Sequence, residues 1–343
     1  MKTTLFLRQL EDYFETYLPK TGGYSPNTIA SYKDTFRLLF IFMEKEKGVR
    51  HYLIDYKHFT LELMEEYLLW LETKRNYNAS SRNQRQAALS SFFKYASRRD
   101  LGALAAFNRI SAVPAKKTTT EAFPYFTVEE IGILLKTPNP ANRLGKRDQA
   151  LLCLLYDSAA RAQELCDMSV GDVRFGHPAR VRLYGKGRKT REVPLSDGCA
   201  GLIRQYIEAQ NFDGSECSGH PLFSSQTHER MTTACIRNIV AKYVELAKHR
   251  HPDLFREANY SPHSFRHSKA VHMVEAGIQL IYIRDFLGHA STTTTEIYAR
   301  ASEKLKEQAL EKLTPGIIQE SKTTWQKDGD LMEFLKALQV KYK

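Results

Sequence analysis

Two histidines, an arginine and a tyrosine lie within 36 residues in the last third of the chain. They are His263, Arg266, His289 and Tyr298. A tyrosine phenol has a pKa of about 10, so it is a poor nucleophile at neutral pH unless cations and proton-transfer partners surround it. Histidine and arginine side chains can supply both. The set is therefore suited to attack on a phosphodiester by a side chain instead of by water.

The order of the surrounding motifs is more specific than the residue types. A His-x-x-Arg motif begins at His263, a Leu-Gly-His motif ends at His289, and Tyr298 follows nine residues later. Upstream, residues 160–165 read Ala-Arg-Ala-Gln-Glu-Leu, and residues 185–195 form a basic, glycine-containing segment that includes Lys186. His-x-x-Arg alone is a weak signal. In this order, the five elements resemble the catalytic core of the tyrosine recombinase family, the phage integrase and Xer-type enzymes, over residues 125–300.

The resemblance implies a catalytic set and a chemistry. The implied catalytic residues are Arg161, Lys186, His263, Arg266, His289 and Tyr298, with Tyr298 as the nucleophile. Planar guanidinium groups can hold the non-bridging oxygens of a phosphate in the transition state, which suits the two arginines. A lysine on a hairpin turn can protonate the leaving 5′ oxygen. A 3′-phosphotyrosyl link conserves the bond energy, and neither a metal nor another cofactor is expected.

Each of these residues also has a structural interpretation. Arg161 could be the ion-pair partner of Glu164 or Asp167. Lys186 could be a solvated hairpin tip, with Arg188 or Lys189 reaching the substrate instead. His263 could simply begin a helix, His289 could cap a helix end as a charged imidazole, and Tyr298 could be a core tyrosine. For His267, His272 and Tyr282 we predict packing or solvent exposure and no function.

The chain departs from the family pattern just before the first arginine. Ser158-Ala159 stand where the family usually has Thr-Gly, and Ala162-Gln163 replace the common aliphatic-Ser pair. An alanine in place of glycine restricts the backbone. We therefore expect an altered turn geometry more than a loss of activity.

Composition and charge agree with a DNA partner without requiring one. The chain has 343 residues, a formal net charge of +11 and a pI of about 9.3, which favour a polyanionic partner but also fit an ordinary basic protein. The five cysteines form no CxxC pair, so we expect reduced, mostly buried thiols and no zinc site. Neither a signal peptide nor a membrane-spanning segment is apparent, which predicts a cytoplasmic, nucleoid-associated protein.

The predicted fold is mainly α with a small β-hairpin or sheet. Residues 1–110 read as a helical bundle, with Ser25-Pro26 starting one helix that Gly48 ends. Residues 111–124 read as an interdomain linker. A capping box at Thr127 opens residues 125–313, which are mostly helical around a hairpin at 180–195. The resemblance makes the first part a SAM-like core-binding domain and the second the mixed α/β tyrosine recombinase catalytic domain.

Two further surfaces are predicted to contact other molecules. In the fourth helix of the bundle, predicted at 80–98, and in the hairpin, the candidate DNA contacts are Arg82, Asn83, Arg85, Lys94, Arg188 and Lys189, although a solvated face is the commoner explanation of such charges. Residues 314–343 form a tail with a short amphipathic helix, which could fold back on its own domain or dock in a neighbouring protomer.

The favoured function is a site-specific DNA recombinase of a mobile element, an integrase or transposase. The resemblance implies a homo-tetramer on double-stranded DNA with inverted-repeat core sites, strand exchange through a Holliday junction, and no membrane. Whether accessory DNA-bending factors take part stays open. Three alternatives remain: an Xer-type chromosome or plasmid dimer resolvase, a type IB topoisomerase-like enzyme that relaxes DNA, and a catalytically silent DNA-binding accessory protein.

Overall fold

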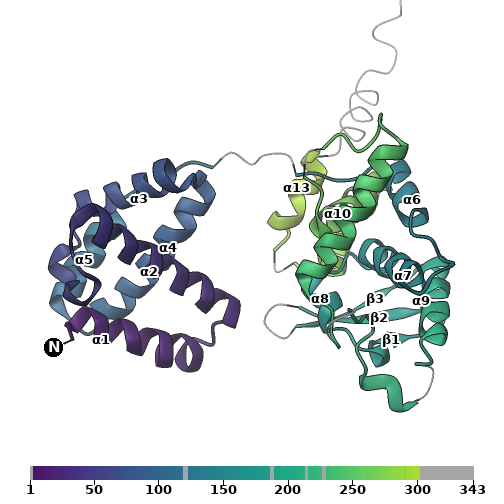
Figure 1. The fold of residues 1–343 in the computed structure, drawn as a ribbon, viewed down its shortest axis with the longest axis horizontal. Coiled ribbons are helices and arrows are strands. Elements are labelled where there is room, and N and C mark those ends of the chain that lie inside the picture. Colours follow the sequence, from purple (N-terminus) through teal and green to yellow (C-terminus); the bar gives the residue numbers. More distant parts are fainter. Residues whose placement is uncertain are drawn as a thin grey trace, which may run out of the picture. The chain divides into compact units, whose positions relative to one another are not determined.

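The structure is a computed structural model that describes residues 3–118, 123–185, 189–212, 215–225, 229–257, 259–289 and 291–301. The chain divides into two compact units, Met1–Glu121 (unit 1) and Ala122–Lys343 (unit 2). Figure 1 traces both units as mainly helical, with one small sheet in unit 2. The predicted fold class, mainly α with a small β-sheet, is confirmed. No helix in the described ranges has the length and apolar character needed to cross a bilayer.

Unit 1 is a bundle of five α-helices in the part that the structure describes. They are α1 (Leu5–Asp12), α2 (Pro26–Lys47), α3 (Leu61–Arg75), α4 (Ala79–Ser97) and α5 (Leu101–Ala112). A π-helical segment (Tyr13–Thr21) continues α1, and two 3₁₀ turns (His51–Leu53 and Tyr56–His58) precede α3. The core is rich in aromatic rings; Phe6, for example, lies within 5.5 Å, centroid to centroid, of Tyr56, Phe59 and Phe92.

The start and end of α2 follow the predicted local signals. The Ser25 hydroxyl accepts a hydrogen bond from the Thr28 amide at 3.2 Å, and Pro26 occupies the first helical position. Gly48 ends the helix with a φ of 66°, a left-handed conformation that glycine adopts without a steric penalty. The prediction for the end of unit 1 was incomplete, because it did not include α5. This helix extends to Ala112, whereas the linker was expected to begin at residue 111.

Unit 2 surrounds a three-stranded sheet with helices. The helices are α6 (Val128–Lys136), α7 (Arg143–Asp157), α8 (Ala162–Asp167), α9 (Asp197–Ala209), α10 (Thr233–Arg250), α11 (Pro262–Glu275), α12 (Leu280–Leu287) and α13 (Thr293–Ala301), with 3₁₀ turns at Val170–Asp172 and Ser215–Gly219. The strands are β1 (Val173–Arg174), β2 (Arg180–Tyr184) and β3 (Thr190–Pro194), antiparallel in the order β1-β2-β3. The predicted hairpin is β2 and β3; β1 was not predicted.

Two apolar clusters organise unit 2. The larger one joins α7, α9 and α10 to the inward face of the sheet, for example Leu151 and Val181. The smaller one contains Ala159 and Tyr298 together with Ala270, Val271, Val274, Ile283 and Leu287 from α11 and α12. Because α11 packs against α7, α12 and α13, this second cluster joins the segment after α7, at Ala159, to three consecutive helices more than 100 positions later. Those helices and the turns beside them carry His263, Arg266, His289 and Tyr298.

Candidate active site

A buried carboxylate holds two arginines at one end of the sheet. Glu164 is 4% exposed, and its Oε1 accepts hydrogen bonds from Nη1 of Arg161 and Nη1 of Arg191, both at 2.9 Å. Its Oε2 accepts from the Arg161 backbone amide and from Arg191 Nη2, both at 2.8 Å. Although it is buried, the pKa of Glu164 is lowered by hydrogen bonding and charge from Arg191 and then by Arg161. The ion pair expected as the structural alternative for Arg161 is therefore present.

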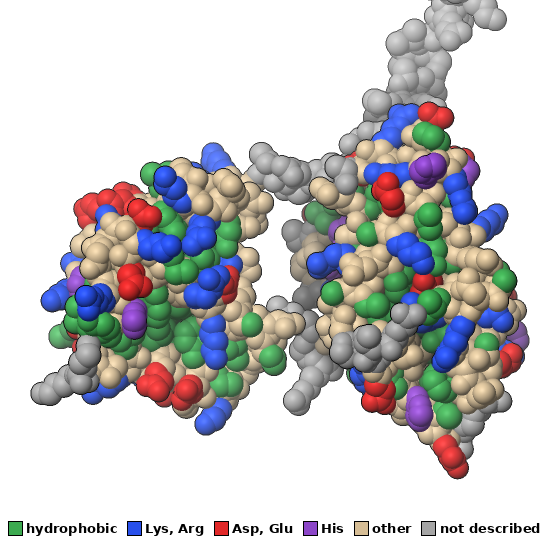
Figure 2. All heavy atoms as spheres, viewed as in Figure 1, with side chains coloured by type: hydrophobic (Ala, Val, Ile, Leu, Met, Phe, Trp, Pro, Cys, Tyr) green, Lys and Arg blue, Asp and Glu red, His purple; other side chains and the backbone are tan. Residues whose placement is uncertain are grey.

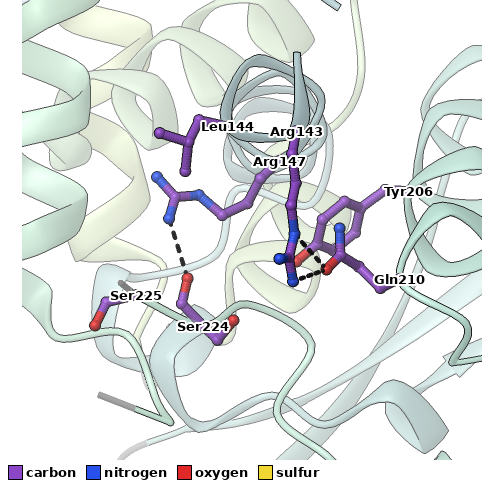
Figure 3. A pocket seen from close by; sticks show the side chains of 7 residues that line it. All are labelled: Arg143, Leu144, Arg147, Tyr206, Gln210, Ser224 and Ser225. Carbon is purple, nitrogen blue, oxygen red and sulfur yellow. Dashed lines mark hydrogen bonds between the residues drawn. The ribbon is translucent and has the colours of Figure 1, made fainter. Parts of the chain in front are cut away.

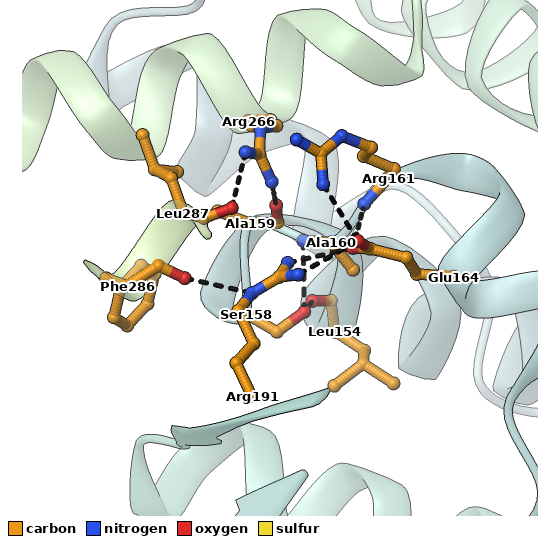
Figure 4. A network of polar contacts seen from close by, with 10 residues as sticks. All are labelled: Leu154, Ser158, Ala159, Ala160, Arg161, Glu164, Arg191, Arg266, Phe286 and Leu287. Carbon is orange, nitrogen blue, oxygen red and sulfur yellow. Dashed lines mark hydrogen bonds and ion pairs between the residues drawn. The ribbon is translucent and has the colours of Figure 1, made fainter. Parts of the chain in front are cut away.

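The ion pair does not bury Arg161 completely. Its side chain keeps a third of its surface exposed, against 12% for Arg191. Figure 4 shows Arg191 reaching from β3 to Glu164, while its Nε donates to the carbonyl of Phe286 at 3.1 Å. Arg191 therefore links β3, α8 and α12. Arg161 is left with both a structural partner and a face toward solvent.

Arg266 is the most buried cation of the group. It is 3% exposed, and its Nη1 and Nη2 donate to the carbonyls of Ala159 at 2.8 Å and Leu287 at 2.6 Å (Figure 4). Burial, together with the nearby charges of Arg161 and Arg191, lowers its pKa to about 10. The guanidinium therefore stays protonated at neutral pH. Its two carbonyl partners fix it at the junction of the loop before α8 and the end of α12.

Ala159 occupies an unusual backbone conformation in this network. Its φ is 48°, in the left-handed region, and its carbonyl is the one that accepts from Arg266. A residue with a Cβ pays about 1–2 kcal/mol in this region. Alanine therefore holds this left-handed turn at the cost of strain that glycine would not have.

His289 follows the end of α12 and lies against the tyrosine ring. Gly288 ends α12 with a φ of 66°, and the next residue, His289, contacts the hydroxyl of Thr295 through Nδ1 at 3.0 Å. The rings of His289 and Tyr298 are nearly parallel, 15° apart, with centroids separated by 6.3 Å. Burial, then Arg266 and Arg161, lower the pKa of His289 to about 4. A neutral imidazole does not fit the alternative of a charged helix cap.

Tyr298 is a buried residue of α13 that lies near these cations. Its side chain is 2% exposed, and burial raises the pKa of its phenol, while Arg266 and Arg161 act in the opposite direction. Its hydroxyl lies 3.1 Å from Nδ1 of His267. Tyr298 is thus both a core residue, as the structural alternative held, and a neighbour of the candidate catalytic groups.

Among the contacts that the structure gives for the Tyr298 hydroxyl, His263 does not appear. It is exposed at the start of α11, with its ring centroid 6.3 Å from that of His267. Partial burial and the charges of Arg266 and Arg161 lower its pKa. The histidine whose ring nitrogen contacts the Tyr298 hydroxyl is His267, for which we predicted packing or solvent exposure. That prediction was incomplete for His267, whereas His272 packs on Tyr156 and Tyr282 is 64% exposed, as expected.

A hollow of about 710 Å³ opens beside these groups. It is lined by Arg161, Gly185, Lys189, Thr190, Arg191, Asp285, Gly288, His289 and Thr294. Lys186 and Arg188 lie outside the described residues. The Gly185 amide donates to the Lys189 carbonyl at 2.8 Å. Guanidinium groups and a histidine bordering one hollow can hold an anionic group by charge and directed hydrogen bonds.

The candidate DNA contacts of α4 are mostly engaged within unit 1. Arg82 is 6% exposed, and its Nη1 donates to Asn83, Gln86 and the Pro114 carbonyl. The Asn83 side chain exchanges two hydrogen bonds with the backbone of Lys116, at 2.8 and 3.0 Å.

Arg85 pairs with Asp34 at 2.6 Å. By contrast Lys94 is exposed. The positions of Arg82, Asn83 and Arg85 favour a structural role, in which the first two anchor the chain that follows α5. Figure 2 shows lysine and arginine side chains spread over the visible face of each unit, interspersed with acids.

A second hollow, of about 450 Å³, lies between α7 and α9 (Figure 3). Its arginines are paired: Arg147 contacts buried Asp148 and the Ser224 carbonyl, and Arg143 donates to Gln210. Of the two hollows, only the larger borders Arg161 and His289.

Three residues that adjoin the candidate site were not predicted as part of it: Arg191, His267 and Phe123. Arg191 stands within the basic hairpin segment and His267 directly follows Arg266, but neither position alone signals a contact.

Comparisons with known proteins agree on one family. The phage integrase family matches residues 124–304, and its N-terminal SAM-like domain matches residues 11–100. A protein of Sinorhizobium fredii, y4rC, named as an integrase/recombinase, is 31% identical over 96% of this chain and 97% of that protein. Tyrosine recombinase XerC of Pelobacter propionicus is 30% identical over 84% of this chain and 89% of its own length.

Solved structures show the same fold at low sequence identity. The XerH site-specific recombinase bound to its palindromic difH substrate has a TM-score of 0.66 and 18% identity, covering 89% of this chain and 86% of that one. The Tn1549 transposon integrase in complex with a circular intermediate DNA has a TM-score of 0.64 and 16% identity, covering 91% and 100%. The family matches and the relatives at 30–31% identity place this chain in the phage integrase family of tyrosine recombinases, as a site-specific recombinase.

Proposed function

We propose that this enzyme is the integrase or transposase of a mobile element, cleaving and rejoining DNA through a 3′-phosphotyrosyl intermediate and a Holliday junction. The observation that carries the chemistry is the position of Tyr298, whose ring stacks on that of His289, a residue that lines the same hollow as Arg161. Burial raises the pKa of the Tyr298 phenol, and Arg266 and Arg161 oppose this effect. A scissile phosphate held there would lie within reach of both cations and nucleophile. Its negative charge would be neutralised without a metal ion.

Each catalytic residue has a proposed task. Arg161 and Arg266 hold the non-bridging oxygens, and His289 donates a hydrogen bond to the phosphate. Tyr298 attacks phosphorus, the bond to the 5′ oxygen breaks, and Lys186 protonates that oxygen. His263 lies at the exposed edge of the same cluster, where it can exchange protons with solvent.

The proposed substrate is double-stranded DNA, engaged by four copies of the chain on two inverted-repeat core sites. Structural relatives bound to difH and to transposon-derived DNA support a DNA substrate. Exposed Lys94 of unit 1 and Lys189 of the hairpin are the proposed backbone contacts, together with Arg188. The tail, residues 314–343, lies outside the described residues, and its docking in a neighbouring protomer remains part of the proposal.

An Xer-type dimer resolvase is the second candidate, and the 30% identity to XerC favours it specifically. Both candidates share one catalytic mechanism and differ in the DNA that they recombine. Sequencing genomic fragments that become covalently trapped on the protein separates them. Sites at the ends of a mobile element support an integrase or transposase, and one unique chromosomal site supports a resolvase.

A nicked suicide duplex tests the chemistry directly. We expect wild type to form a covalent protein–DNA adduct and Tyr298→Phe to form none. Tyr156→Phe is the matched control, because Tyr156 is also a tyrosine whose hydroxyl contacts a histidine of α11, at 2.9 Å. Its adduct should form at the wild-type rate. An adduct that persists in Tyr298→Phe would exclude Tyr298 as the nucleophile.

Gel filtration of the DNA complex tests the assembly. Four protomers per pair of duplexes support strand exchange, whereas one protomer per duplex supports a topoisomerase-like enzyme. Removing residues 321–343 should reduce the four-protomer species if the tail docks in trans. Unchanged assembly after this deletion would favour docking in cis.

A further inference from the structure

The hydroxyl of Tyr298 contacts a histidine outside the catalytic set implied by the family resemblance. Nδ1 of His267 lies 3.1 Å from the phenolic oxygen, within hydrogen-bond distance. The two residues come from α11 and α13, which pack against each other. His267 directly follows Arg266, so its side chain leaves the helix about 100° farther around the axis. Arg266 thereby reaches the backbone carbonyls while His267 reaches the tyrosine.

An aromatic side chain from the start of unit 2 covers this pair. The Phe123 ring lies 4.5 Å from the His267 ring and 5.3 Å from the Tyr298 ring, centroid to centroid, and meets the tyrosine edge-on at 75°. With Tyr298 2% exposed and His267 half-buried, solvent has restricted access to the hydrogen bond. A proton leaving the phenol is therefore more easily taken by a neighbouring side chain than by bulk water.

The His267 imidazole is neutral and can accept a proton, but its lowered pKa makes it a weak base until an anionic phosphate binds nearby. Burial, followed by the charges of His263 and Arg266, lowers its pKa to about 4, so the imidazole is neutral at neutral pH. A neutral imidazole offers one unprotonated ring nitrogen, and in the tautomer with hydrogen on Nε2 that nitrogen is Nδ1. The charged or titratable groups that influence this contact are His263 and Arg266 on α11, Arg161 before α8, and His289 after α12.

We propose that His267 is the general base that takes the phenolic proton of Tyr298 during strand cleavage, an inference that rests on the proposed recombinase chemistry. As the phenolic oxygen forms its bond to phosphorus, the O–H bond breaks and the proton moves to Nδ1. The P–O5′ bond breaks with its electron pair on the 5′ oxygen, which receives a proton from the general acid. In the reverse reaction, His267 returns the proton to the tyrosine. The negative phosphate beside Arg161 and Arg266 offsets their effect on the imidazole and favours its protonated form.

His267 is better placed for this task than His263. The structure gives His267 a direct contact with the reacting atom, whereas the His263 ring stands next to that of His267, 6.3 Å away between centroids, at the exposed start of the helix. His263 can therefore pass a proton between His267 and solvent. General-base catalysis of this kind contributes about 10²–10⁴-fold in rate.

The test is single-turnover cleavage of the nicked suicide duplex by the full chain carrying His267→Asn. The asparagine oxygen can accept a hydrogen bond near the position of Nδ1, but it cannot take up a proton at neutral pH. We expect cleavage at pH 7 to slow by about 10²-fold or more, with unchanged DNA affinity. The rate of the variant should then rise about tenfold per pH unit, because hydroxide becomes the acceptor, whereas the wild-type rate stays nearly constant above pH 7.

His272→Asn is the matched control. His272 lies on the same helix, and its Nδ1 contacts the Tyr156 hydroxyl at 2.9 Å. This variant should cleave within about threefold of wild type with an unchanged pH profile. Thermal melting and DNA binding check that both variants fold.

Three outcomes overturn the inference. One is a His267→Asn rate within about threefold of wild type at pH 7. Another is a slow His267→Asn rate that does not increase with pH, which would assign His267 a positioning role alone. A folded His267→Asn protein that no longer binds DNA would also contradict it. If wild type itself formed no adduct, the proposed function would fail instead, so the two failures are distinguishable.

Discussion

Arg191 donates a hydrogen bond to each carboxylate oxygen of Glu164, from Nη1 to Oε1 at 2.9 Å and from Nη2 to Oε2 at 2.8 Å. The same carboxylate accepts from the side chain and the backbone amide of Arg161. One buried anion therefore orients two guanidinium groups from different elements, one on β3 and one at the start of α8. The candidate phosphate-binding cation Arg161 is held in place by a residue that has no proposed contact with the substrate.

Replacing Glu164 with glutamine should destabilise unit 2 strongly. The change leaves two guanidinium groups without their anion, and removing one partner of a buried ion pair typically costs about 3–5 kcal/mol. Because Arg161 is one-third exposed and partly screened by solvent, we expect the lower end, about 3 kcal/mol, in urea denaturation. Glu192→Gln is the control, since its pair with Arg174 is exposed and should contribute less than about 1 kcal/mol. Equal effects of the two changes would contradict the central role of Glu164.

Ala159→Gly should be much better tolerated than Ala160→Gly. Both alanines are buried, and each change loses about 0.8 kcal/mol of methyl burial and about 0.4–1 kcal/mol through the more flexible unfolded chain. At Ala159, with its φ of 48°, glycine also relieves about 1–2 kcal/mol of strain, so the net change is near zero. Urea denaturation of the two variants should differ by about 1 kcal/mol or more. Equal destabilisation would show that Ala159 is not strained.

A substrate with sulfur at the 5′ bridging position should identify the general acid. A thiolate leaves without protonation, so this substrate should restore the slow cleavage by Lys186→Ala to near the wild-type rate. Lys189→Ala should cleave the ordinary substrate within about tenfold of wild type, because Lys189 has a proposed role in DNA backbone contact only. Single-turnover rates on both substrates measure this. If the sulfur substrate rescues Lys189→Ala instead of Lys186→Ala, Lys189 is the acid.

Acid should destabilise unit 2 partly through two histidines. The pKa values of His267 and His289 are lowered to about 4, whereas an unfolded histidine has a pKa of about 6.5. Between pH 6.5 and 4 the unfolded chain binds more protons than the folded chain, so stability falls as the pH falls through this window.

The double variant His267→Asn, His289→Asn lacks this contribution. Its Tm should fall less than that of wild type between pH 7 and pH 4.5. His249→Asn, at an exposed position of α10, should follow wild type. A double variant with the wild-type pH dependence would contradict the lowered pKa values.

Local signals in the sequence predicted many element boundaries. The Ser25-Pro26 start of α2 and the Thr127 capping box of α6 depend on hydrogen bonds within one helical turn, so neighbouring residues determine them. Strand β1 was missed because its two residues form a strand only by pairing with β2. Helix α5 also has a local N-cap signal, Asp100, whose side chain accepts from the Ala103 amide, so its start too was predictable from neighbouring residues.

The order and spacing of Arg161, Arg266, His289 and Tyr298 were readable in the sequence because the motifs are short and local. The partners of these residues were not. Arg191 donates to Glu164, 27 positions away in the sequence, and His267 contacts the Tyr298 hydroxyl, 31 positions away. Such contacts depend on how β3 and α8, or α11 and α13, pack against one another, and local periodicity carries no information about that packing. The sequence by itself therefore indicated the residues of the candidate site, whereas tertiary structure decided which side chains hold the arginines and which histidine nitrogen contacts the Tyr298 hydroxyl.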